Sequence, residues 1–71
     1  MSDIVVDTPV TLGAFLKVAG AAATGGHAKV LIQQGEVCVN GAIETRRGRK
    51  LVAGDLVGVA GSEFRVCSSA T

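Results

Sequence analysis

The sequence predicts an α+β fold in which two N-terminal helices pack on a small, mainly antiparallel sheet. Apolar residues recur at helical spacing in two segments before residue 36. Alternating polar and apolar residues follow over 36–40, and the Asn-Gly pair at 40–41 is typical of a tight hairpin turn. The 71 residues suffice for a single domain over 1–71, with a core over about 11–66. Because 48% of the residues are apolar and only 18% are charged, a folded chain is expected rather than a disordered one.

The first helix is predicted to begin after Thr11, whose hydroxyl can accept a hydrogen bond from the exposed amides of the first turn. Gly20 is a natural end for this helix. Residues 1–7 precede it as either a frayed lead or a short edge strand, and Pro9 discourages helix at Thr8. The apolar face of this helix consists of Leu12, Phe15, Leu16 and Ala19.

The second helix is predicted to begin after Thr24 and to end at Gly35. Its buried face is expected to contain Ala28, Leu31 and Ile32. Strands are expected after it, because short β-branched runs alternate with turn residues. The predicted strands are 36–40, 42–45, 56–59 and 64–66, and the predicted turns are 40–41, 53–55 and 61–62.

Positive charge is concentrated in one short run, although the net charge of the chain is only +1. Four of the seven basic residues are Arg46, Arg47, Arg49 and Lys50, interrupted only by Gly48. Outside this run three basic residues face six acidic ones, a balance of 3 − 6 = −3. A focused patch on an acidic body attracts a polyanion to one place. A solvated loop that keeps the protein soluble is the alternative interpretation.

The sequence predicts neither a metal site nor a cofactor. A zinc site needs about four ligands, whereas Cys38 and Cys67 form no CxxC pair and His27 is the only histidine. Cys38 alternates with valines in a predicted strand and is most simply a small packing residue. The apolar stretches are too short for a membrane span or a secretory signal. We therefore expect a reduced, cytoplasmic protein with no membrane partner.

The stretch AKVLIQQGEVCVNG at 28–41 resembles the S-four-type RNA-binding domain, also called the alpha-L motif. The resemblance covers 11–59, with Gly54-Asp55 matching a later Gly-Asp pair and Leu12–Lys17 matching the first helix. The matching positions in the main stretch are Ala28, Leu31, Ile32, Gly35, Val37, Val39, Asn40 and Gly41. The resemblance implies two helices on a small sheet and the binding of RNA.

Two further features resemble a stand-alone bacterial branch of this family, namely Thr24-Gly25-Gly26 and the run TRRGRK at 45–50. Members of this branch are single small domains. The resemblance implies RNA binding in translation or at the ribosome, but it does not indicate a particular RNA. Many family members carry an arginine where this chain has Gly25.

The basic run supplies the first candidates for RNA contact, because arginine forks match phosphate oxygens and lysine acts as a mobile point charge. Gly25 and Gly26 begin the second helix, where free amides suit phosphate, although a tight turn that requires small residues is the alternative. His27 either donates to a phosphate or is incidental. The remaining candidates, Lys29 and Lys17, extend the patch, while Lys17 is equally compatible with a partner for the helix dipole.

Three function classes follow from these features. The first hypothesis is a non-catalytic module that recognises structured ribosomal or transfer RNA mainly through phosphates, because few groups here can read base edges. The alternative is a protein-interaction module whose basic loop meets an acidic ribosomal or RNA-processing partner. An enzyme is disfavoured, because the sequence contains no paired carboxylates at recognisable spacing and no phosphate-binding loop. A monomer is expected.

Overall fold

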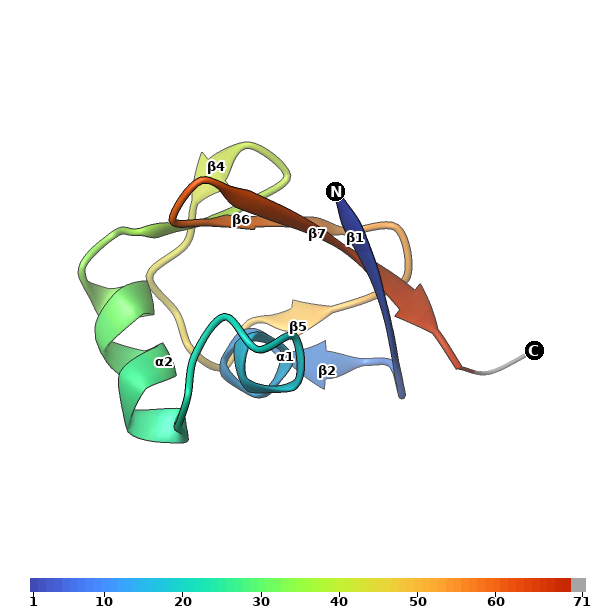
Figure 1. The fold of residues 1–71 in the computed structure, drawn as a ribbon, viewed down its shortest axis with the longest axis horizontal. Coiled ribbons are helices and arrows are strands. Elements are labelled where there is room, and N and C mark those ends of the chain that lie inside the picture. Colours follow the sequence, from blue (N-terminus) through green and yellow to red (C-terminus); the bar gives the residue numbers. More distant parts are fainter. Residues whose placement is uncertain (70–71) are drawn as a thin grey trace.

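The computed structural model describes residues 1–69 and shows two helices covering one face of a sheet (Figure 1). The helices are α1 (Leu12–Val18) and α2 (Gly25–Gln33). The strands are β1 (Ser2–Val6), β2 (Val10–Thr11), β3 (Val37–Val39), β4 (Ala42–Ile43), β5 (Lys50–Leu51), β6 (Leu56–Val59) and β7 (Ser62–Ser68). The predicted α+β fold is confirmed, with the difference that two strands precede the helices.

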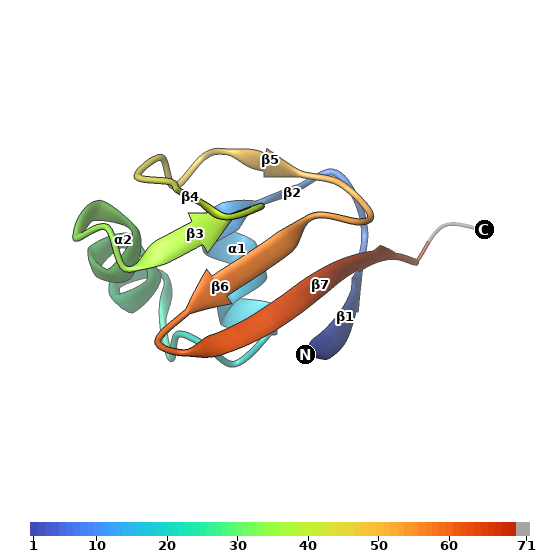
Figure 2. The ribbon, with the colours of Figure 1, turned by 90° about the horizontal axis from the view of Figure 1, so that it is seen from above.

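Five strands form the main sheet in the order β1-β7-β6-β3-β4. Every pairing in this sheet is antiparallel except that of β1 with β7, which is parallel. Seen from above, α1 lies beneath the middle of the sheet and α2 lies beyond the start of β3 (Figure 2). A second, two-stranded sheet pairs β2 with β5, so that Val10 faces Leu51 and Thr11 faces Lys50.

Both predicted helix starts are confirmed. The Thr11 hydroxyl accepts a hydrogen bond from the Ala14 amide at 3.3 Å, and the Thr24 hydroxyl accepts one from the His27 amide at 3.0 Å. Each threonine therefore satisfies an amide that has no partner within its own helix.

The core lies between the helices and the sheet, and it contains the predicted apolar faces. Phe15 is fully buried, and its ring meets that of Phe64 edge to face with the centroids 6.5 Å apart. Leu51, in the two-stranded sheet, is also fully buried, so that β5 closes the core beside α1. The largest fully buried side chains are Phe15, Leu12, Leu16, Ile32, Leu51, Val37, Val39, Val57 and Val66.

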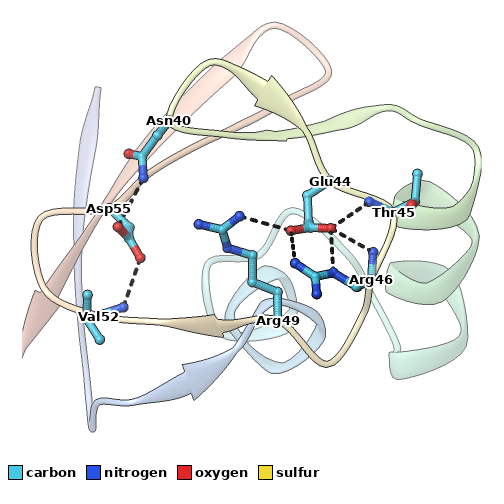
Figure 3. Close-up of polar contacts among 7 residues, drawn as sticks. All are labelled: Asn40, Glu44, Thr45, Arg46, Arg49, Val52 and Asp55. Carbon is cyan, nitrogen blue, oxygen red and sulfur yellow. Dashed lines mark hydrogen bonds and ion pairs between the residues drawn. The ribbon is translucent and has the colours of Figure 1, made fainter.

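The predicted Asn-Gly turn is confirmed and is tied to the second half of the chain. Asn40 and Gly41 have φ values of 52° and 85°, the positive values that a two-residue hairpin loop requires. The Asn40 side chain donates to Asp55 Oδ1 at 3.1 Å (Figure 3). It also accepts from the Leu56 amide at 2.9 Å. Asp55 Oδ2 accepts from the Val52 amide at 2.9 Å, so this carboxylate also shapes the predicted turn at 53–55.

The structure decides one alternative and moves several predicted boundaries. Of the two alternatives for residues 1–7, the short edge strand is confirmed, because β1 pairs with β7 from the far end of the chain. The strand predicted over 42–45 ends at Ile43, since Glu44 turns toward the basic loop. The last turn lies at Ala60-Gly61 instead of 61–62, because Ser62 pairs directly with Val59.

Candidate nucleic-acid interface

The basic loop, residues 46–49, is fixed across the start of α1 by backbone hydrogen bonds. The Leu12 amide donates to the Arg49 carbonyl at 2.8 Å, and the Gly13 amide donates to the Arg47 carbonyl at 3.1 Å. Within the loop the Arg49 amide donates to the Arg46 carbonyl at 3.3 Å. The first amides of α1, which lack partners in their own helix, are thus used to hold the basic loop in place.

Gly13 allows this close packing. A β-carbon at Gly13 would lie 2.6 Å from Cγ and 3.2 Å from Cδ of Arg47, closer than atoms can pack without movement. The Arg47 side chain therefore crosses directly over the first turn of α1. A glycine in a helical first turn is unfavourable by intrinsic propensity, and this contact accounts for it.

A single carboxylate, Glu44, organises two of the four basic residues (Figure 3). Its Oε2 accepts hydrogen bonds from the Thr45 amide at 3.1 Å, the Arg46 amide at 3.2 Å and Arg46 Nε at 3.2 Å. Its Oε1 accepts from Arg49 Nη1 at 3.0 Å and from Arg46 Nη2 at 3.4 Å. The Glu44 side chain is only 10% exposed, whereas the side chains of Arg46 and Arg49 are 76% and 34% exposed.

Glu44 is ionised over the whole physiological range. Hydrogen bonds from Arg46, and then from Arg49, lower the pKa of this carboxyl group from 4.5 to about 2. The same contact with Glu44 raises the pKa of Arg46. The basic loop together with Glu44 therefore carries a charge of 4 − 1 = +3 when Lys50 is included.

A groove of about 470 Å³ runs between the basic loop and the starts of the two helices. It brings together three of the predicted contact residues from three separate segments, namely Lys17, Gly25 and Arg47, and Gly48 of the basic loop also lines it. Thr11, Gly13 and Ala14 complete the lining. Two cations, Lys17 and Arg47, and no acidic residue line this groove, so its charge favours an anionic ligand.

The start of α2 explains the second group of candidates. A β-carbon at Gly25 would meet no atom within 4 Å, and one at Gly26 would meet only the Thr24 hydroxyl at 3.9 Å. The alternative that a tight helix start requires these glycines is therefore wrong. Within residues 1–69 neither the Gly25 amide nor the Gly26 amide has a protein acceptor, so both are available to a ligand.

The remaining candidates lie outside the groove. The Nδ1 atom of His27 accepts a hydrogen bond from the Ala23 amide at 3.2 Å, which leaves Nε2 as the nitrogen that can donate outward. Lys29 is exposed on α2, and Lys50 is exposed on β5 opposite Thr11. The structure thus leaves the side chains of these three residues out of the groove lining.

Ion pairing separates the seven basic residues into two groups. Arg46 and Arg49 pair with Glu44, and Arg65 pairs with Asp3 across β7 and β1 at 3.0 Å. Within the described part of the chain no acidic partner is found for Lys17, Lys29, Arg47 or Lys50. Of these four cations, Lys17 and Arg47 line the groove, Lys29 lies on α2 and Lys50 lies on β5.

Sequence reasoning did not single out Glu44 or Gly13. An isolated acid two residues before a basic run was a signal for Glu44, and a glycine in a helical first turn was a signal for Gly13. Among residues 1–69 no group of three or more His, Cys, Asp or Glu side chains is arranged to hold a metal ion. Neither of the two described helices is long and apolar enough to cross a membrane.

Comparison with known proteins places this arrangement in a family. The family model of the S4 domain matches residues 4–67. The chain belongs to the S4 domain family. The match covers the main sheet, both helices and the basic loop, so all the candidate contact residues lie within the S4 domain.

Two bacterial relatives share most of their length with this S4 domain chain. The Bacillus subtilis (strain 168) protein named "Probable ribosome maturation protein RlbA" is 48% identical over 59 residues, which are 82% of this chain and 83% of the relative. YbcJ of Escherichia coli (strain K12) is 44% identical over 57 residues, which are 80% and 81% of the two chains. The solution structure of YbcJ, described as an alpha-L motif involved in RNA binding, aligns with a TM-score of 0.72 at 38% identity over 94% of this chain and 87% of that chain.

Proposed function

We propose that this protein is a non-catalytic RNA-binding protein that recognises structured ribosomal or transfer RNA mainly through phosphate contacts. The relative named for ribosome maturation favours ribosomal RNA, and the YbcJ structure described as involved in RNA binding favours RNA over a protein partner. The protein acts by occupying a folded RNA site, and no reaction is required of it.

The groove beside the basic loop is the observation that carries this proposal. It joins Lys17 of α1, Gly25 of α2 and Arg47 of the loop, which are far apart in the sequence. Arg47 offers a planar fork of donors to phosphate oxygens, and Lys17 offers a point charge. Lys50, Lys29, His27 and Gly26 are exposed outside the groove lining, and we expect them to contact a longer RNA backbone.

Two structural features limit how this protein can recognise RNA. Only two aromatic residues are present, and Phe15 is fully buried while Phe64 packs against it. Stacking of unpaired bases on aromatic rings is therefore not the basis of binding. The exposed groups around the groove are cations and backbone amides, which read the shape and phosphate positions of a folded RNA rather than its sequence.

The salt dependence of RNA binding tests the proposal. With about three phosphates neutralised, the logarithm of the association constant should fall with the logarithm of the salt concentration with a slope of about −2 to −3. Affinity for a labelled RNA hairpin should then drop about 16- to 64-fold between 50 and 200 mM salt. Fluorescence anisotropy titrations at four salt concentrations measure this slope. No binding at 50 mM salt, or a slope near zero, would contradict the proposal.

Introducing an arginine at Gly25 should strengthen RNA binding by about tenfold, since a charge-assisted hydrogen bond to phosphate contributes about 1.5–3 kcal/mol. The structure offers open space for the new side chain beside Arg47. Titration of the same hairpin with G25R and with the uncharged control G25Q measures the change. Both variants should fold, because glycine is not required at this helix start. Weaker binding by both variants would show that the RNA contacts the Gly25 backbone itself.

A further inference from the structure

Resting on the proposed RNA-binding function, we propose that Glu44 is a positioning residue, whose carboxylate holds the basic loop so that Arg47 and Lys50 are presented to RNA. Glu44 is the one buried charged residue among residues 1–69. Its carboxylate lies beside the surface with the highest positive charge, where a negative charge weakens the attraction of an RNA backbone. Its presence there therefore requires a role other than attraction.

The contacts of Glu44 supply that role. Residues 46–50 carry four positive charges, which repel one another and favour a spread-out loop. Three hydrogen bonds from the side chains of Arg46 and Arg49 join both arginines to one carboxylate, and the Thr45 and Arg46 amides donate two more to it. Arg46 and Arg49 thus bracket the peptide that contains Arg47 and Gly48.

The same bracket is tied to α1 from its other side. The carbonyls of Arg47 and Arg49 accept from the first amides of α1, and the Arg47 side chain packs over Gly13. Because Glu44 holds one side of the loop and α1 holds the other, the direction of Arg47 is set before RNA binds. Binding then has no further entropic cost for ordering the loop. Two arginines of the run therefore hold the loop, while Arg47 and Lys50 remain without an acidic partner in the described part of the chain.

Replacing Glu44 by glutamine separates positioning from simple attraction, because the two predict opposite signs. E44Q raises the net charge from +1 to +2, so attraction alone predicts tighter RNA binding. Positioning predicts binding about tenfold weaker, since the loop must then be ordered by the RNA itself. The matched control is E63Q, which makes the same change in charge at an exposed position on β7, away from the loop.

Replacing Glu44 by aspartate tests the positioning role without any change in net charge. E44D keeps the net charge of the wild-type protein but shortens the side chain by one methylene, so one carboxylate no longer spans Arg46 and Arg49. Weaker binding by E44D is expected under the positioning role. Circular dichroism shows whether each variant folds. If E44Q fails to fold, E44D still tests the positioning role.

The experiment titrates a labelled RNA hairpin with the wild-type protein, E44Q, E44D and E63Q at 0.1 M salt. NMR spectra of the RNA-free proteins follow the Nε–H signals of Arg46 and Arg49 and the amide signals of Leu12 and Gly13. We expect E44Q and E44D to bind more weakly, with faster solvent exchange at the two arginines and an intact core. A merely structural role would not change arginine exchange and RNA affinity together in a folded protein.

Two other outcomes are distinguishable. If the wild-type protein binds RNA and E44Q binds as tightly as E63Q, the positioning role of Glu44 is overturned and the RNA-binding function stands. If the wild-type protein does not bind the hairpin or a panel of ribosomal RNA fragments at 50 mM salt, the proposed function fails, and the role of Glu44 in RNA binding fails with it.

Discussion

Replacing Lys17, Arg47 and Lys50 together with alanine should weaken RNA binding by about 100-fold or more at 0.1 M salt. These three cations come from α1, the basic loop and β5, and none of them pairs with an acid in the described part of the chain. When a phosphate contact is lost, the counterions at that phosphate are no longer released on binding. The dependence of the association constant on salt concentration should therefore approach zero. Anisotropy titrations of the triple variant at several salt concentrations measure both quantities.

Single variants provide the control for this result. R47A and R65A each remove one positive charge, but Arg65 already pairs with Asp3 and lies on β7. We expect R47A to bind RNA about 5- to 10-fold more weakly than the wild-type protein at 0.1 M salt, because one phosphate contact is lost. R65A should bind like the wild-type protein. Equal losses in the two variants would mean that net charge, rather than the groove, attracts the RNA.

Local sequence signals predicted the parts of the fold that depend on neighbouring residues. Thr11 and Thr24 lie next to the amides that they cap, and the Asn40-Gly41 turn requires only two adjacent residues with positive φ. The pairing of β1 with β7 joins residues about sixty positions apart and leaves no such local signal. The β2–β5 pair was missed because its partners are about forty positions apart and each strand is only two residues long.

The candidate interface was only partly predictable in the same way. The sequence showed the basic run, but it did not show that Arg46 and Arg49 are occupied by Glu44. It also left Gly25 and Lys17 as separate candidates, whereas folding brings both to the groove beside Arg47. The sequence shows where basic residues cluster. Which of them pair with an internal acid and which remain available to a ligand depends on how the folded loop packs against α1.

Stability and RNA binding should be linked in this protein, and the substitution of Phe15 by alanine tests the link. Phe15 is fully buried on α1, on the same short helix whose first amides hold the basic loop. Removing a buried phenylalanine costs about 3–5 kcal/mol of unfolding free energy. The matched control is V18A on the same helix, where the valine is 61% exposed, and a change within about 0.5 kcal/mol is expected there.

A domain of 71 residues has a total stability of about 4–11 kcal/mol. With a stability in the lower part of this range, F15A should populate the unfolded state at 37 °C. Urea unfolding followed by circular dichroism measures this loss. An RNA that binds only the folded protein restores about 2.7 kcal/mol when its free concentration is 100 times the dissociation constant. Adding the hairpin to F15A should therefore recover much of the helical signal, whereas adding it to F15A that also carries the Lys17, Arg47 and Lys50 replacements should not. Recovery in both proteins would place the RNA contact away from the groove, because the folded state would then be stabilised through other residues.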